Sequence, residues 1–135
     1  VEELEEAPDC CSKQLMDATE LLFPDDSFDN VTFFYTLMYM TTEEQQKSIR
    51  EAARVLRAGK WMHIWDCDIR SAYPEPFVID LDIKSGTHKI HTAYGIVKRD
   101  AQSSDSIVHL LENAGLRIES LQEKDGQFHI QCRKG

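Results

Sequence analysis

Residues 31–65 read VTFFYTLMYMTTEEQQKSIREAARVLRAGKWMHIW, and this stretch decides the fold class. It opens with a β-branched and aromatic run at 31–35, which is typical of a strand buried on both faces. The pattern then predicts a helix over residues 43–57 and a second buried strand over residues 61–65. A strand, a helix and a strand in this order form a βαβ unit, which predicts an α/β fold with a parallel sheet.

The helix over residues 43–57 carries its own start and stop signals. Thr41 and Glu44 fit a capping box, in which each side chain satisfies a free backbone donor. Gly59 is the predicted stop. The apolar positions recur at i, i+3, i+4 and i+7 and so form one face: Ile49, Ala52, Ala53 and Leu56.

Upstream of this unit, the pattern is weaker. Residues 1–7 are acidic and compatible with a helix that Pro8 ends. Residues 14–17 are a short strand candidate, and residues 23–27 are rich in turn formers.

Downstream, residues 70–99 break the α/β pattern. Apolar residues alternate with polar ones over 77–83 and lead to a turn at 84–87, so we expect an inserted hairpin whose second strand lies within 88–97. A second helix is predicted over residues 105–113. Strands at 116–122 and 127–133 are joined by an Asp-Gly turn, which predicts a closing β-hairpin.

Composition sets limits on function. The 135 residues fit one domain, and the net charge of −9 disfavours nonspecific nucleic-acid binding. No apolar run approaches the roughly 20 residues of a membrane helix, and no secretory signal is visible. The cysteines show no C-x-x-C spacing, so we expect free thiols in a cytoplasmic protein: Cys10, Cys11, Cys67 and Cys132.

Residues 17–69, DATELLFPDDSFDNVTFFYTLMYMTTEEQQKSIREAARVLRAGKWMHIWDCDI, resemble the middle of a class I S-adenosylmethionine-dependent methyltransferase of the type 11 group. The matching features are an Asp-Ala pair, a D-x-S-F-D segment, a buried strand and a helix that ends in A-x-R-V-L. Residues 112–134 resemble the last helix and closing antiparallel hairpin of that family. The resemblance implies a Rossmann-like methyltransferase sheet with helices on its faces.

The family's first strands have no counterpart in this sequence. None of the six glycines is spaced G-x-G, and the acidic residue that holds the cofactor ribose is absent. The family strand order is 3-2-1-4-5-7-6, so the resemblance implies one incomplete domain over residues 1–135 with a sheet of order 4-5-7-6. Residues 14–17 would then be displaced, disordered or paired with another chain. The strand at 31–35 would have an exposed edge.

Five residues match the family's cofactor contacts. Asp17 and Ala18 match the adenine contact, where the carboxylate accepts from the exocyclic amine and the next amide meets a ring nitrogen. Phe34 and Tyr35 match the strand end that faces the methionine portion, although we expect the Phe34 side chain to pack in the core. Tyr39 matches a position near the transferred methyl group, with core packing as the equal alternative.

Residues after the second strand are weaker candidates. Asp66 and Asp68 stand where open α/β sheets place ligands, and paired carboxylates can orient or deprotonate an acceptor. The alternative, solvated loop acids, is the stronger one. A metal site from His63, Asp66 and Cys67 matches no established spacing, so we expect none.

The inserted hairpin carries His88 and His91 close to Tyr94. At strand spacing i and i+3 the two histidines face opposite sides, so we expect the hairpin to be a lid over an acceptor pocket or a dimer contact.

The resemblance therefore implies methyl transfer from S-adenosylmethionine to an unidentified acceptor, and the acidic composition favours a small molecule. The alternative is a degenerate methyltransferase-fold domain that dimerises or binds a partner through its exposed edge. The sequence names neither the acceptor nor a catalytic residue.

Overall fold

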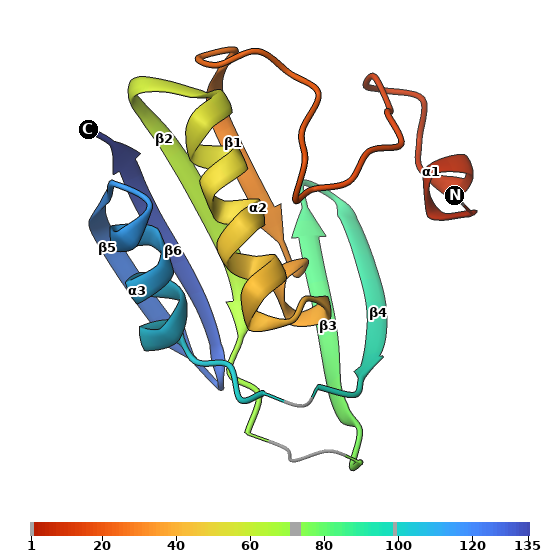
Figure 1. Cartoon of the computed structure of the whole chain (residues 1–135). Coiled ribbons are helices and arrows are strands. Elements are labelled where there is room, and N and C mark those ends of the chain that lie inside the picture. The colour runs from red at the N-terminus through yellow and green to blue at the C-terminus, as the bar shows by residue number, and fades with distance from the viewer. Residues whose placement is uncertain (1, 71–73, 99) are drawn as a thin grey trace.

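The computed structural model describes residues 2–70, 74–98 and 100–135 (Figure 1). Four strands form one sheet of order β1-β2-β6-β5, and β3 and β4 form a separate two-stranded sheet. This order confirms the predicted order 4-5-7-6. The elements are α1 (Glu2–Glu6), β1 (Phe28–Phe34), the 3-10 helix η1 (Leu37–Tyr39), α2 (Thr42–Val55), β2 (Leu56–Cys67), β3 (Phe77–Ser85), β4 (His88–Ile96), α3 (Ser104–Asn113), β5 (Leu116–Lys124) and β6 (Gln127–Lys134).

The predicted βαβ unit is present. β1 and β2 pair in parallel, with Phe34 opposite Trp65 at the carboxyl end. β6 pairs antiparallel with both β2 and β5. Asp125 and Gly126 have φ angles of 53° and 74°, as a type I′ turn requires, so the closing hairpin is confirmed.

Helix α2 begins where the capping box predicts. The Thr41 side chain accepts from the Glu44 amide, and the Glu44 side chain accepts from the Thr41 amide. The helix ends at Val55, two residues before the predicted end, because the backbone at Leu56 is already extended. β2 therefore starts at Leu56 and is longer than the predicted strand at 61–65.

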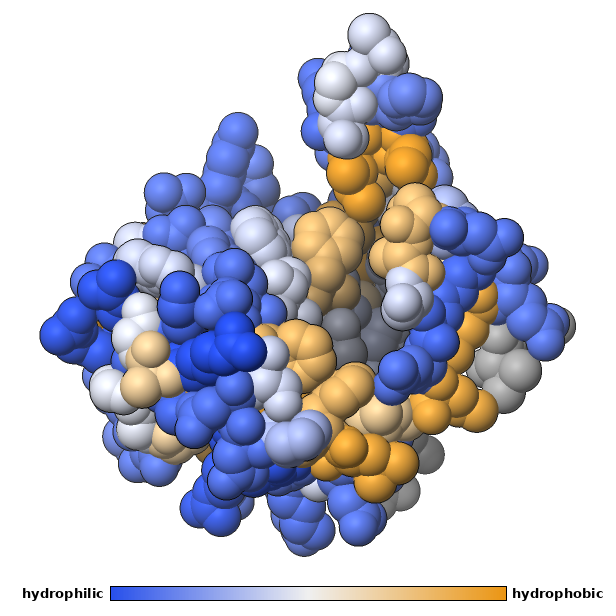
Figure 2. Space-filling model, turned by 90° about the horizontal axis from the view of Figure 1, so that it is seen from above, coloured by the Kyte–Doolittle hydropathy of each residue, from blue (hydrophilic) through white to orange (hydrophobic). Residues whose placement is uncertain are grey.

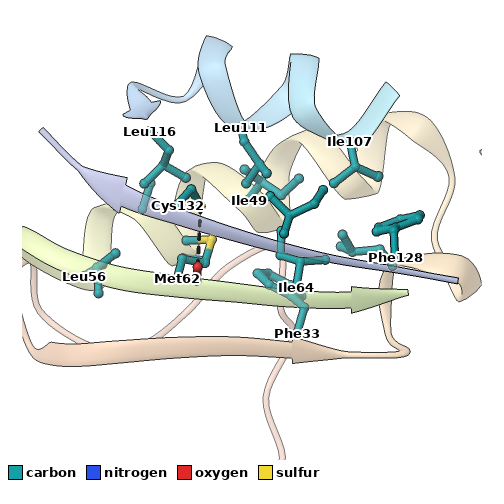
Figure 3. Close-up of a cluster of buried hydrophobic side chains, with 14 residues drawn as sticks. Phe33, Ile49, Leu56, Met62, Ile64, Ile107, Leu111, Leu116, Phe128 and Cys132 are labelled. Carbon is teal, nitrogen blue, oxygen red and sulfur yellow. Dashed lines mark hydrogen bonds between the residues drawn. The ribbon is translucent and has the colours of Figure 1, made fainter. Parts of the chain in front are cut away.

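The main core lies between the sheet and both long helices. Figure 3 shows side chains from the strands pointing toward α2 and α3, which cover the same face. The prediction that the first strand is buried on both faces is wrong, because Phe33 is 8% exposed but Phe34 is 47% exposed. The odd and even positions of a strand face opposite sides, and among the described residues no helix covers the side of Phe34.

A second core holds the β3–β4 hairpin against the carboxyl edge of the sheet. Its members come from the hairpin, from η1, from the end of β2 and from the residues just after β2: Met38, Cys67, Ile69, Ile79, Leu81 and Ile96. The alternating apolar residues of β3 supply the inner face of the hairpin, as the period of two requires.

Residues 14–17 form no strand, so the strand candidate is wrong, and the segment lies outside the sheet, in agreement with the expectation that it is displaced. They do not pair with the outer edge of β1, which stays open because β1 pairs only with β2 in the described chain. Farther along the chain, Arg54 donates to the backbone oxygens of Leu21 and Phe23 at 2.9 and 2.8 Å and so holds the stretch before β1. Seen from above, hydrophobic residues gather around a hollow, whereas most of the surrounding surface is hydrophilic (Figure 2).

Candidate functional site

The carboxyl ends of β1 and β2 meet the start of β6 at one edge of the sheet. Tyr35 follows β1 with a φ angle of 47°, a left-handed conformation that costs a non-glycine residue about 1–2 kcal/mol. Its amide donates to the Trp65 oxygen at 2.8 Å, and its hydroxyl donates to Gln127 Oε1 at 2.6 Å. These two bonds hold the strained residue in place.

Two adjoining cavities of about 510 and 940 Å³ open at this edge and share Asp80, Asp125 and Gln127. We call them together the edge cleft. Residues of β3 form one wall and residues around the β5–β6 turn form another, while Phe34, Tyr35 and Trp65 contribute from the sheet. Open α/β sheets bind ligands at this edge, so the edge cleft is the candidate acceptor site.

Aromatic rings line the uncovered face of the sheet beside the edge cleft. Trp65 and His129 are stacked with ring centroids 4.1 Å apart, and His63 stacks on Trp65 at 5.5 Å. The His63 Nδ1 and His129 Nε2 atoms are 3.2 Å apart. Burial and the neighbouring His63 lower the pKa of His129.

Three predicted cofactor residues lie at this edge. Phe34 and Tyr35 line the larger cavity, and the Phe34 side chain does not pack in the core as predicted. Tyr39 ends η1, is 55% exposed and contacts Tyr94 of the hairpin, with ring centroids 6.3 Å apart. An edge-to-face contact of this kind joins η1 to β4.

Asp17 and Ala18 line neither cavity. Asp17 Oδ1 accepts from the amide and the hydroxyl of Thr19 at 2.8 and 2.7 Å, and this bonding lowers the pKa of Asp17. The Asp17 backbone oxygen accepts from the Glu20 amide at 3.1 Å, so Asp17 stabilises a turn. Among the described residues, the side-chain hydrogen bonds of Asp17 use Oδ1, and Oδ2 has no partner there.

The two acids at the carboxyl end of β2, Asp66 within the strand and Asp68 just after it, differ in their surroundings. Asp66 is 0% exposed, so the alternative of a solvated loop acid is wrong for this residue. Asp68 lines the smaller cavity, accepts from the Ser104 amide at 3.1 Å and pairs with Arg70 at 3.6 Å. Of the two predicted acceptor contacts, only Asp68 therefore faces the edge cleft.

Asp66 belongs to a buried polar cluster that sequence patterns did not indicate. Its other members are Gln45, Lys98 and Gln102, which are 3%, 7% and 2% exposed. Burial raises the pKa of Asp66 and lowers the pKa of Lys98, and each charge partly offsets the shift of the other. No periodic or spacing signal marks these residues, because their partners come from distant parts of the chain.

The remaining histidines and the thiols form no further centre. His91 bonds to Asp82 at 2.9 Å on the outer surface of the hairpin. In the described ranges, no three His, Cys, Asp or Glu side chains gather as a metal site would require. The four cysteines are free, and no helix of the described ranges is long and apolar enough to cross a membrane.

Comparison with known proteins gives a family match over part of the chain. Residues 2–64 match the methyltransferase domain family. No curated protein matches the chain by sequence. Among solved structures, the fold matches a S-adenosylmethionine-dependent methyltransferase from Methanosarcina mazei with a TM-score of 0.65 and 17% identity, over 98% of this chain and 74% of that one.

Two further structures give the same result. The PH0226 protein from Pyrococcus horikoshii OT3 matches with a TM-score of 0.63 and 15% identity, over 90% of this chain and 61% of that one. The glycopeptide N-methyltransferase MtfA, in complex with S-adenosylmethionine, matches with a TM-score of 0.63 and 12% identity, over 99% of this chain and 66% of that one. The chain thus spans less than two thirds of the PH0226 protein, and at these identities the likeness establishes the fold.

Proposed function

We propose that this chain, whose residues 2–64 match the methyltransferase domain family and whose sheet has the class I methyltransferase order, takes part in methyl transfer from S-adenosylmethionine to a small-molecule acceptor. The observation that carries the proposal is the carboxyl edge, where Phe34 and Tyr35 line the edge cleft and Tyr39 contacts Tyr94 of the hairpin whose strand β3 forms one wall. The resemblance implies cofactor contacts at these positions. The free thiols fit a reducing, cytoplasmic compartment.

The residues present fit the cofactor at its adenine end. Asp17 Oδ2 is free to accept from an exocyclic amine, and the Ala18 amide makes no hydrogen bond within the described part of the chain. The methionine end has no glycine turn in this sequence to receive it. We therefore assign the adenine contact to Asp17 and Ala18 and propose Phe34, Tyr35 and Tyr39 for the methionine side.

The bound cofactor would supply an electrophilic methyl group on a sulfonium. The task of the chain is then to align an acceptor lone pair with that methyl group and to exclude water, which needs no dedicated base. Asp68 is the carboxylate that faces the edge cleft, and it is suited to orient an acceptor amine or hydroxyl. The hairpin covers one side of the edge cleft and so has the position of a lid.

Calorimetric titration of S-adenosylhomocysteine into the purified chain tests this proposal. We expect micromolar binding, equivalent to about −8 kcal/mol. Asp17→Ala should weaken that binding at least tenfold, whereas Asp9→Ala, an exposed acid in the same segment, should leave it unchanged. No heat at millimolar ligand would contradict a cofactor site in this chain.

A non-catalytic interaction module is the second candidate. The observation that favours it is the edge strand β1, which pairs only with β2 among the described strands and carries the exposed Phe28 and Phe34. Sedimentation of the same sample separates the two candidates. A dimer without cofactor binding would support the module, and a cofactor-binding monomer would support the enzyme.

A further inference from the structure

The buried cluster behind the carboxyl edge is centred on Gln102. The Gln102 Nε2 atom donates to Asp66 Oδ1 at 2.7 Å and to the Cys67 oxygen at 2.8 Å. Its Oε1 atom accepts from Gln45 Nε2 at 2.7 Å and from Lys98 Nζ at 3.3 Å. A glutamine amide has two donor hydrogens and two acceptor lone pairs, and Gln102 uses all four.

The charged neighbours fix the orientation of this amide. Lys98 can only donate, so the atom facing it must be the oxygen, and ionised Asp66 can only accept, so the atom facing it must be the nitrogen. The Gln102 backbone is held as well, because its amide and oxygen both bond to Ile69, at 3.1 and 2.8 Å. Gln102 is therefore fixed at six points.

The other three members of the cluster hold the backbone of η1. Asp66 Oδ2 accepts from the Met38 amide at 3.3 Å, and Gln45 Nε2 donates to the Leu37 oxygen at 2.9 Å. Lys98 Nζ donates to the Met40 oxygen at 2.6 Å. One side chain each from β2, α2 and the segment after β4 thus holds Leu37, Met38 and Met40, on both sides of Tyr39.

Tyr39 lies on the outer side of this same turn. The backbone groups of its neighbours Met38 and Met40 bond to the buried cluster. The Tyr39 ring itself is 55% exposed and contacts Tyr94. Lys98 comes two residues after the end of β4, so the cluster also ties the hairpin to the turn that carries Tyr39.

We propose that Gln102 is a positioning residue, which holds η1 through Asp66, Gln45 and Lys98 and so sets Tyr39 against Tyr94 of the hairpin. We call the hydrogen bonds that join Gln102, Asp66, Gln45 and Lys98 to residues 37–40 the clasp. The link from the clasp to ligand binding rests on the proposed function. The clasp itself concerns only how firmly residues 37–40 are held, and this can be tested without any ligand.

Gln102→Glu is the decisive variant, because its effect depends on pH. At pH 8 the introduced carboxylate places a second ionised oxygen against Asp66 Oδ1 and the Cys67 oxygen, where an N–H donor stood before. At pH 5.5 one proton shared between the two carboxyls restores a donor. The other titratable groups that act on this cluster are Lys98, Cys67, Glu44 and Asp100.

The experiment measures protection factors of the amides in residues 37–40 by hydrogen exchange. We expect Gln102→Glu to lower them at least tenfold at pH 8 and to recover most of the loss at pH 5.5, while Gln102→Ala loses protection at both values. Gln131→Ala removes a glutamine bonded to Ser120 on the open face and should change nothing in this segment. If Gln102→Ala fails to fold, Gln45→Met keeps the volume, removes one donor to η1 and should lower the same protection.

Unchanged protection in residues 37–40, or a Gln102→Glu loss that does not recover at pH 5.5, would overturn the clasp. Binding of S-adenosylhomocysteine is measured on the same samples and should weaken at least tenfold in Gln102→Glu at pH 8. If protection falls but the affinity stays that of the wild type, the positioning role is refuted. If the wild-type chain binds no S-adenosylhomocysteine, the proposed function fails while the exchange data still decide the clasp.

Discussion

The Tyr35 hydroxyl donates a hydrogen bond of 2.6 Å to Gln127 Oε1, although the two residues lie 92 positions apart. The bond joins the end of β1 to the start of β6, two strands that are separated in the sheet by β2. Both residues line the larger cavity of the edge cleft. The carboxyl edge is therefore built by pairs of residues that no local pattern connects.

Tyr35→Phe removes this bond and keeps the ring. We expect it to lower the free energy of unfolding by about 1 kcal/mol, the usual net contribution of such a bond. Urea unfolding followed by tryptophan fluorescence measures the change. Tyr94→Phe is the matched control, because no hydrogen bond of the Tyr94 hydroxyl is found in the described ranges. Equal stability of the two variants would contradict a stabilising role for the Tyr35 hydroxyl.

The four cysteines should divide into two reactive and two protected thiols. Burial raises the pKa of Cys67 and of Cys132 to about 12, and both side chains are enclosed, whereas Cys10 and Cys11 are exposed. Because the thiolate is the nucleophile, iodoacetamide at pH 7.5 should add to two sites in the native chain and to four in urea. Intact-mass spectrometry counts the additions, and rapid native labelling of Cys67 would refute its enclosed position.

His91 should titrate above the ordinary value for histidine. The hydrogen bond to Asp82 raises its pKa above 6.5. The ion pair therefore stabilises the hairpin fully below pH 6.5, and this contribution is lost as the pH rises through the higher pKa of the folded state. Titration by NMR of the His91 ring measures the value directly. Asp82→Asn should return it toward 6.5, whereas Asp105→Asn on α3 should leave it unchanged.

Ile64→Ala should be among the most destabilising changes in the sheet. Ile64 is 0% exposed at the centre of β2 and packs in the main core with residues of both long helices (Figure 3). Removing three buried carbons costs about 2–5 kcal/mol when the site cannot collapse. Ile90→Ala on the hairpin surface, where the side chain is 57% exposed, is the control and should cost far less. Comparable losses in the two variants would contradict the assigned core.

The strand order could be predicted from the sequence. The elements follow from local patterns, and their order in the sheet follows from the family resemblance. The capping box at Thr41 and Glu44, the Asp125–Gly126 turn and the alternation over residues 77–83 each fix a backbone geometry within a few residues. The resemblance then supplied the order 4-5-7-6, which the sheet has.

Burial was harder to predict than strand position. The apolar run at 31–35 indicated burial on both faces, but Phe34 is half-exposed because the covering helices lie on one side only. Residues 14–17 have a sequence compatible with a strand, yet no described strand pairs with them, although the outer edge of β1 is open. The residues of a short segment do not determine which element will cover it or which strand will pair with it.

The sequence by itself determined the α/β class, the βαβ unit, both hairpins and the candidates Asp17, Ala18, Phe34, Tyr35, Tyr39, Asp66 and Asp68. Only the tertiary structure decided that Asp66 is buried while Asp68 faces the edge cleft, and that Gln45, Lys98 and Gln102 gather around Asp66. The physical reason is the range of the interactions. Caps, turns and periodicity act over a few residues, whereas the buried cluster forms from groups up to 58 positions apart, whose hydrogen bonds exist only once the sheet edge, α2 and the hairpin have come together.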